Sequence, residues 1–226
     1  AYMQGLQENN ILACAKHFPG HGDTDKDSHK TLPIIRHSKY RLKKIELKPF
    51  EHLINNGLGS IMTAHLFIPS LDETDKTPIS LSKKVVDGLL TKEMGFKGLK
   101  FTDGLNMKAV SDLYDPGDLD VKALIAGNDV LLCAENVPRA VKMIKQSIKE
   151  GIISEDEINE KCRKILIAKK WMSLDNFKPI DLDIIHDSLI TEKTNRINQK
   201  LVKSSVTLLQ NYDGLIPLKR LDTLKI

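Results

Sequence analysis

The sequence predicts an α/β fold in which a parallel sheet is covered by helices on both sides. Four short runs of almost wholly apolar residues alternate with longer segments of helical periodicity. Strands that are buried on both faces of a parallel sheet have this character, and helices form the crossovers between them. The predicted strands are residues 11–15, 60–64, 99–102 and 129–133.

The predicted helices lie between these strands, and their ends follow recognised start and stop signals. Gly57 and Gly59 supply the left-handed conformation at which a helix ends, and Pro138 suits the first turn of another helix. Ser154 and Glu157 have the spacing of a capping box. The predicted helices are 1–10, 42–55, 80–94, 107–113, 138–150 and 154–171, with one more that ends at residue 126.

The number of strands limits the architecture. A (β/α)₈ barrel needs eight strands, and four are found before the character of the chain changes. Because residue 1 already lies in a predicted helix, we expect residues 1–175 to be the C-terminal half of a (β/α)₈ TIM barrel. An open, doubly wound sheet is the alternative. Residues 176–203 are predicted to be a linker and a helix, and residues 204–226, with a strand over 206–210, the start of a following α/β domain.

Composition excludes several classes of protein. The 226 residues carry a formal net charge of only +4, with acidic and basic side chains interleaved, so we expect no nucleic-acid partner. The longest apolar runs fall well short of the roughly 20 residues that a membrane-spanning helix needs, so we expect no membrane span. Cys14, Cys133 and Cys162 are odd in number and far apart, which predicts buried thiols rather than a disulfide framework or a zinc knuckle.

Ionisable residues stand at or just past the end of each predicted strand. The carboxyl ends of parallel strands lie on one face of the sheet, where (β/α)₈ barrels build their active sites. The sequence therefore predicts that these side chains gather on one rim: Lys16, His17, His65, Asp103 and Glu135.

The loop from Lys16 to His29 holds the densest chemistry in the chain. Its sequence, KHFPGHGDTDKDSH, places three histidines and three aspartates around two glycines and a proline. One alternative is a polar loop that is exposed to solvent and has no functional role. A divalent metal site is a second alternative, since imidazole and carboxylate groups are good metal ligands.

Asp103 and His65 each have a structural and a functional interpretation. Asp103 follows a strand and precedes a helical pattern, so it can cap a helix, and it can also be an attacking or stabilising carboxylate. His65 can be bonded to a backbone carbonyl or can contact a ligand. We assign His65 to substrate binding.

These residues resemble glycoside hydrolase family 3, in particular its β-N-acetylglucosaminidase branch. The similarity covers most of the chain in the order of the family. It rests on KHFPGHGDT with DSH (16–24 and 27–29), GFKGLKFTDGLNM (95–107), AGNDVLL (126–132), and SSVTLLQN with GLIPL (204–211 and 214–218).

The resemblance implies a retaining mechanism with a covalent intermediate. Asp103 would be the nucleophile that attacks the anomeric carbon. In this branch the acid/base is a histidine, here His29, paired with Asp27. Lys16 and His17 would bind sugar hydroxyls. The residues themselves support the pair, because an imidazole with a pKa of about 6.5 can give and then take a proton near neutral pH, and a nearby carboxylate orients it.

The expected function is therefore removal of terminal β-linked N-acetylglucosamine, with cell-wall fragments in peptidoglycan turnover as the expected substrates. The expected partner is a carbohydrate, and no cofactor is required. A metal-dependent TIM-barrel hydrolase and a non-catalytic carbohydrate-binding module are the alternatives. The sequence leaves the compartment open between bacterial cytoplasm and cell envelope.

Overall fold

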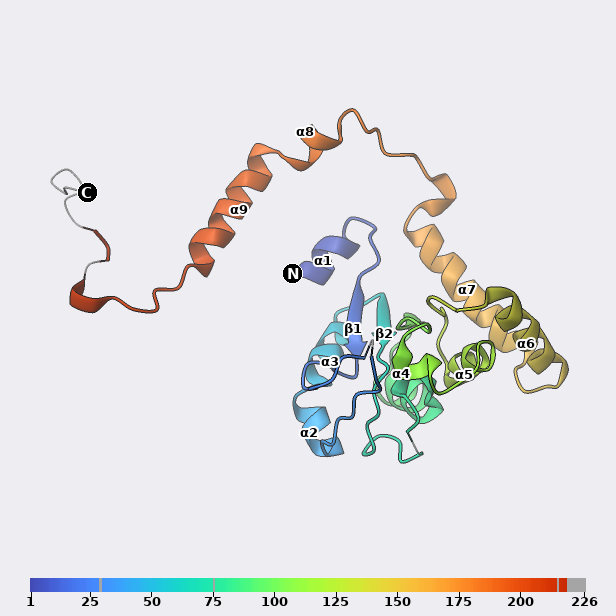
Figure 1. Ribbon diagram of the computed structural model, residues 1–226. Helices are drawn as coiled ribbons and strands as arrows, with labels where there is room; N and C mark the ends of the chain where they lie inside the picture. Colours follow the sequence, from blue (N-terminus) through green and yellow to red (C-terminus); the bar gives the residue numbers. More distant parts are fainter. Residues whose placement is uncertain (29, 75, 215, 219–226) are drawn as a thin grey trace. The chain divides into compact units, whose positions relative to one another are not determined.

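A computed structural model describes residues 1–28, 30–74, 76–214 and 216–218 (Figure 1). The chain forms two compact units, residues 1–176 and 177–226. The first unit contains α1 (Tyr2–Gln7), β1 (Cys14–Phe18), α2 (Lys39–Lys44), α3 (Lys48–Asn55), β2 (Ser60–Thr63), η1 (Ile79–Leu81), η2 (Lys84–Glu93), β3 (Leu99–Thr102), α4 (Lys108–Ser111), α5 (Asp118–Ala126), α6 (Val137–Lys149), α7 (Glu155–Trp171) and η3 (Leu174–Asn176).

The sheet of the first unit is parallel, as predicted, with the strand order β1-β2-β3. The predicted fourth strand is reduced to a single bridge between Phe101 and Val130. Side chains replace the other ladder partners: the Asp129 carboxylate accepts the Lys100 N–H at 2.9 Å, and Thr102 Oγ1 accepts the Leu132 N–H at 3.0 Å. The prediction of a strand over 129–133 is therefore wrong in extent but right in position.

Strand β1 contains a bulge at the residues that the sequence places just after the strand. Ala15 pairs with Ile61 and Phe18 pairs with Thr63, so Lys16 and His17 together face one residue of β2. The prediction that the strand ends at Ala15 is wrong, because the ladder resumes beyond the bulge. A bulge re-aims side chains and is common beside active sites.

Two predicted helices differ from the observed ones. The predicted helix over 42–55 is split into α2 and α3, because Pro49 lies in the first turn of α3 and cannot continue an earlier helix. The helix before Gly95 is the π-helix η2, and Ser82 Oγ accepts the Val85 N–H at its start. The capping box of α7 is confirmed, with Ser154 Oγ accepting the Glu157 N–H at 3.1 Å.

The core of the first unit lies between the sheet and its helices, and Figure 1 shows α3 beside β1. Its largest fully buried side chains include Phe18, Ile61, Leu66, Leu90 and Phe96. Gly98 allows β2 and β3 to approach, since a Cβ there would lie 2.3 Å from the Gly59 carbonyl oxygen. The prediction of buried thiols is wrong: all three cysteines are exposed, because β1, the rim and the outer side of α7 carry them.

The second unit contains α8 (Ile185–Leu189), α9 (Glu192–Ser205) and η4 (Tyr212–Gly214). The predicted helix from residue 191 is confirmed, and Thr191 Oγ1 caps it by accepting the Thr194 N–H at 3.2 Å. Residues 206–210 form no strand, since the described part of this unit offers no neighbouring strand to pair with. Among the helices of the described residues, none is long and apolar enough to cross a bilayer.

Candidate active site

Asp103 lies immediately after β3, at the carboxyl rim of the sheet, and its backbone is held on the neighbouring strand. Its N–H donates to the Thr63 carbonyl oxygen at 3.0 Å. Its Oδ1 accepts the Gly104 N–H at 2.9 Å, and its side chain is 17% exposed. One carboxylate oxygen is therefore fixed by the backbone, while the group as a whole remains open to solvent.

His17 faces Asp103 from the bulge of β1. Its Nε2 lies 3.8 Å from Asp103 Oδ2, within reach of an ion pair when the imidazole is protonated. The adjacent Lys16 side chain is exposed. The structure therefore brings His17 and Asp103 together as the strand-end argument predicts, and the role of Lys16 in sugar binding stays a prediction.

The loop after β1 is folded by its own polar side chains. The His21 ring lies edge-on to the His17 ring, with 5.9 Å between centroids. The His21 Nδ1 is bonded to Thr24 Oγ1 at 3.0 Å, and Nε2 to Ser28 Oγ at 3.1 Å. The loop is thus an organised structure rather than a solvated coil.

The predicted acid/base pair is only partly described. His29 lies outside the described residues. Asp27 is exposed, and its carbonyl oxygen accepts the N–H groups of Lys30 and Thr31 at 3.0 and 3.1 Å. The assignment of Asp27 and His29 to proton transfer stays a prediction.

His65 is buried, and both of its ring nitrogens are hydrogen-bonded within the protein. Its side chain is 0% exposed, its Nδ1 is bonded to Ser80 Oγ at 2.7 Å, and its Nε2 to the Gly104 carbonyl oxygen at 3.0 Å. Burial lowers the pKa of His65, although the Asp103 carboxylate opposes this shift. The geometry therefore supports the structural interpretation of His65, and its assignment to substrate binding stays a prediction.

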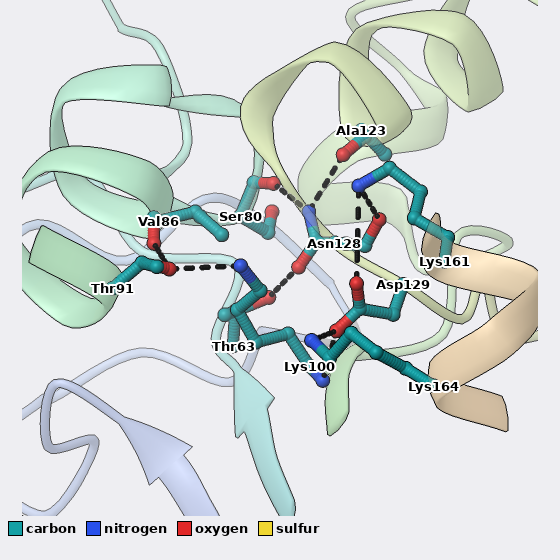
Figure 2. Close-up of polar contacts among 10 residues, drawn as sticks. All are labelled: Thr63, Ser80, Val86, Thr91, Lys100, Ala123, Asn128, Asp129, Lys161 and Lys164. Carbon is teal, nitrogen blue, oxygen red and sulfur yellow. Dashed lines mark hydrogen bonds and ion pairs between the residues drawn. The ribbon is translucent and has the colours of Figure 1, made fainter. Parts of the chain in front are cut away.

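Asn128 is a buried polar residue that the sequence analysis includes only as part of AGNDVLL. Its Nδ2 donates to the carbonyl oxygens of Ser80 and Ala123, both at 2.8 Å (Figure 2). Its Oδ1 accepts from Thr63 Oγ1 at 3.0 Å. A signal was present in the sequence, since an amide inside an apolar run needs buried partners.

A second buried network surrounds the next residue, Asp129 (Figure 2). Lys164 Nζ lies 2.5 Å from Asp129 Oδ2, and Lys161 Nζ donates to the Asn128 carbonyl oxygen at 2.8 Å. Lys100 Nζ donates to Thr91 Oγ1 at 2.8 Å. Burial lowers the pKa of Lys100 to about 8, with Asp129 opposing and the two other lysines reinforcing the shift.

One group among the described residues could hold a metal ion, formed by Asp23, His37 and Glu46. Of these, only Asp23 belongs to the loop on which the metal hypothesis was based. An existing cation already lies there, since Arg41 Nη2 is 3.0 Å from Glu46 Oε1 and 3.9 Å from Asp23 Oδ2. His37 Nε2 is 2.6 Å from Asp23 Oδ2. The group is therefore an ion-pair cluster, in which Glu46 Oε2 and Arg41 Nε are buried without a hydrogen-bond partner.

Comparison with known proteins places this site in a family. A family model described as the glycosyl hydrolase family 3 N terminal domain matches residues 1–168. The chain belongs to glycosyl hydrolase family 3. The predicted family and the predicted α/β fold of TIM-barrel type are thereby confirmed.

Individual relatives of this family 3 chain carry related names. The beta-hexosaminidase A of Pseudoalteromonas piscicida is 26% identical over 238 residues, covering 97% of this chain and 39% of the relative. The beta-hexosaminidase of Nitrosospira multiformis is 35% identical over 142 residues, covering 63% and 40%. A solved glycoside hydrolase family 3 β-N-acetylglucosaminidase from Paenibacillus sp. str. FPU-7 has 34% identity and a TM-score of 0.85, covering 92% and 40%. The chain spans about two fifths of the length of these relatives.

Proposed function

We propose that the protein containing this chain is a retaining glycoside hydrolase that removes terminal β-linked N-acetylglucosamine. The observation that carries this proposal is the Asp103 carboxylate at the carboxyl rim of the sheet. Its Oδ1 is held by the Gly104 N–H, and its Oδ2 points toward His17. The names of the relatives support the substrate class.

In the proposed first step, Asp103 Oδ2 forms a bond to the anomeric carbon as the bond to the leaving oxygen breaks. Protonated His29 gives its proton to that oxygen, and Asp27 stabilises the imidazolium beforehand. The product of this step is a glycosyl ester on Asp103. A carboxylate with one oxygen already bonded to a backbone N–H is oriented before substrate arrives, which lowers the entropic cost of attack.

In the second step, water attacks the anomeric carbon from the face that the leaving group vacated. Neutral His29 takes a proton from this water, and the carboxylate of Asp103 is released. Two inversions at one carbon give net retention. His17, at 3.8 Å from Asp103 Oδ2, is placed to bond a sugar hydroxyl beside the reacting carbon.

The test of the nucleophile uses aryl β-N-acetylglucosaminide with the complete protein. We expect Asp103→Ala to lower kcat by at least about 10⁴-fold, since a covalent catalyst has been removed. Added azide would then attack directly and give a glycosyl azide of inverted configuration. Asp112→Ala, which removes an exposed aspartate just after α4, serves as the matched control and should keep full activity. Unchanged turnover in Asp103→Ala would remove Asp103 from the mechanism.

The test of the proton donor uses two leaving groups. His29→Ala should slow substrates with poor leaving groups far more than activated aryl substrates, because the latter need little protonation. His52→Ala, on the exposed side of α3, is the control. Equal losses for both leaving groups would count against His29 in the first step, and activity that disappears with a chelator and returns with zinc would favour a metal-dependent hydrolase.

Cell-wall fragments are the proposed natural substrates. A soluble peptidoglycan fragment with terminal N-acetylglucosamine and a chitin disaccharide present the same sugar on different acceptors. Comparing kcat/KM for the two would measure the preference directly. A protein that cleaves only the chitin disaccharide would contradict the peptidoglycan assignment while leaving the glycosidase assignment intact.

A further inference from the structure

Beneath the candidate nucleophile, three buried residues, here called the relay, are linked by hydrogen bonds: His65, Ser80 and Asn128. His65 and Ser80 are 0% exposed, as is Asn128. The relay connects Asn128, just after α5, to the Asp103–Gly104 turn. The bond that Asn128 Nδ2 donates to the Ser80 carbonyl oxygen is 2.8 Å, the bond between Ser80 Oγ and His65 Nδ1 is 2.7 Å, and the bond from His65 Nε2 to the Gly104 carbonyl oxygen is 3.0 Å. We propose that the relay is a positioning device that holds this turn, and with it the attacking carboxylate, in the reactive orientation.

The hydrogen atoms of the relay can be assigned from its acceptors. The Gly104 carbonyl oxygen can only accept, so His65 Nε2 must carry a hydrogen. The neutral ring then has an acceptor at Nδ1, which receives the hydroxyl hydrogen of Ser80. Each end of the imidazole has one complementary partner, and the relay is satisfied with His65 neutral. The lowering of the pKa of His65 by burial agrees with this state.

Asn128 fixes the other end of the relay. Its amide hydrogens are both used, on the carbonyl oxygens of Ser80 and Ala123, and its oxygen accepts from Thr63 Oγ1. The backbone of Ser80 is thereby held at the position from which its hydroxyl reaches His65. The same Thr63 supplies the carbonyl oxygen that accepts the Asp103 N–H. Two routes from Asn128 therefore converge on the nucleophile.

The turn itself needs this support because it contains a glycine. Gly104 has no side chain to restrict its conformation, yet it connects the carboxylate to the rest of the chain. Its N–H holds Asp103 Oδ1, its carbonyl oxygen is held by His65, and the following Leu105 N–H donates to the Leu132 carbonyl oxygen at 2.9 Å. Loss of the His65 bond would free one side of the turn, and a displacement of about 1 Å can cost about a hundredfold in rate.

The inference rests on the proposed function, because it concerns the same nucleophile. In the complete protein, His65→Leu should lower kcat by about a hundredfold with KM changed less than about threefold, because orientation in the transition state is lost rather than binding. His65→Gln should recover at least about tenfold of that loss, since its Nε2 can donate to the Gly104 carbonyl oxygen. Ser80→Ala should lower kcat by about tenfold, because His65 Nδ1 loses its donor and the ring is then held at one nitrogen only.

A control variant separates positioning from general stability. Ser82 is also buried, two residues beyond Ser80, but its Oγ donates to Asp72 Oδ2 at 2.5 Å and has no bond to the relay. Ser82→Ala should lower the unfolding temperature without changing kcat per folded molecule. Should His65→Leu not fold, Ser80→Ala provides the same comparison.

A readout that does not depend on turnover completes the test. The ¹⁵N chemical shifts of the His65 ring should show Nε2 protonated and Nδ1 unprotonated but hydrogen-bonded in the unmodified protein, and in Ser80→Ala the Nδ1 shift should move to that of a ring nitrogen without a hydrogen bond. The relay is overturned if the ring has the opposite tautomer, or if His65→Leu and Ser80→Ala keep the kcat of Ser82→Ala. Failure of the proposed function would look different: the unmodified protein would be inactive or Asp103→Ala active, while the tautomer measurement would still decide the relay.

Discussion

Asn128 and Asp129 are neighbours in the chain, yet each is the centre of a different buried network. Asn128 is surrounded by neutral partners, namely hydroxyl and carbonyl groups of Thr63, Ser80 and Ala123. Asp129 is surrounded by cations, with Lys164 and Lys161 of α7 at 2.5 and 3.9 Å. The first network leads to the Asp103–Gly104 turn, and the second fastens α7 to the sheet.

The difference follows from what each network must do. A neutral network of fully used hydrogen bonds has directional geometry and little dependence on salt, which suits the positioning of a reacting group. A charged cluster tolerates small displacements, but it has a large desolvation cost that partners must offset. We therefore expect changes at Asn128 to affect both rate and stability, and changes at Asp129 to affect stability alone.

The largest expected effect comes from removing the charge at the centre of the second network. Asp129→Leu leaves Lys100, Lys161 and Lys164 close together without their shared carboxylate, and we expect a loss of about 3 to 5 kcal/mol in unfolding free energy. Denaturant unfolding measures this, with the exposed Asp112→Leu as control. A loss below about 1 kcal/mol would show that the lysines find other partners.

Removing the centre of the first network should have a smaller effect on stability and an additional one on catalysis. Asn128→Leu leaves buried carbonyl groups of Ser80 and Ala123 without donors, and we expect a loss of about 3 kcal/mol together with about a tenfold lower kcat. Unfolding curves and steady-state kinetics, compared with the exposed Asn159→Leu on α7, test both parts. An unchanged kcat would remove Asn128 from the relay.

One contribution to the pH dependence of stability comes from Lys100. Lys100 has a pKa of about 8 in the folded state and an ordinary value of 10.5. Between these values the unfolded chain binds more protons, so this group makes stability rise with pH, and below pH 8 it costs the folded state about 1 to 3 kcal/mol. Lys100→Met should be more stable at pH 7 and should lack this rise in urea unfolding from pH 8 to 10. A parallel pH curve for both proteins would refute the assignment.

The smallest expected effect comes from removing the cap of α7, and it tests whether α7 contributes to stability alone. The Ser154 Oγ caps α7 by accepting the Glu157 N–H. Ser154→Ala removes this bond and should lower the free energy of unfolding by about 1 kcal/mol while kcat is unchanged. A thermal melt with Ser173→Ala, beyond the end of α7, as control measures it. A lower kcat per folded molecule would mean that α7 influences the site.

The strand-end argument predicted much of the fold and part of the site. Apolar runs located the sheet, and the rule that parallel strands end on one face brought His17 and Asp103 together, now at 3.8 Å. His65 also follows a predicted strand, but its side chain is buried. The Ser80 hydroxyl, fifteen residues later in the chain, is hydrogen-bonded to its ring. Such a contact depends on tertiary packing and has no local signal.

Helix boundaries and the bulge were missed for related reasons. Pro49 splits one predicted helix into two, which the proline alone could have indicated. The bulge at Lys16 and His17 depends on the register with β2, which periodicity within β1 cannot reveal. Asn128 could have been suspected from its apolar surroundings, but its partners lie up to 65 residues away.

The extra residue in β1 has a consequence for anyone who transplants this loop into another barrel. Two residues of β1 occupy the place of one, so deleting either Lys16 or His17 would restore an even ladder with Phe18 still opposite Thr63, but it would remove the bulge that aims the side chains between them. The sheet could survive such a deletion, but the imidazole opposite the carboxylate would not be presented. A graft therefore has to begin upstream of the irregularity, at Cys14 or earlier, rather than at the first residue of the loop.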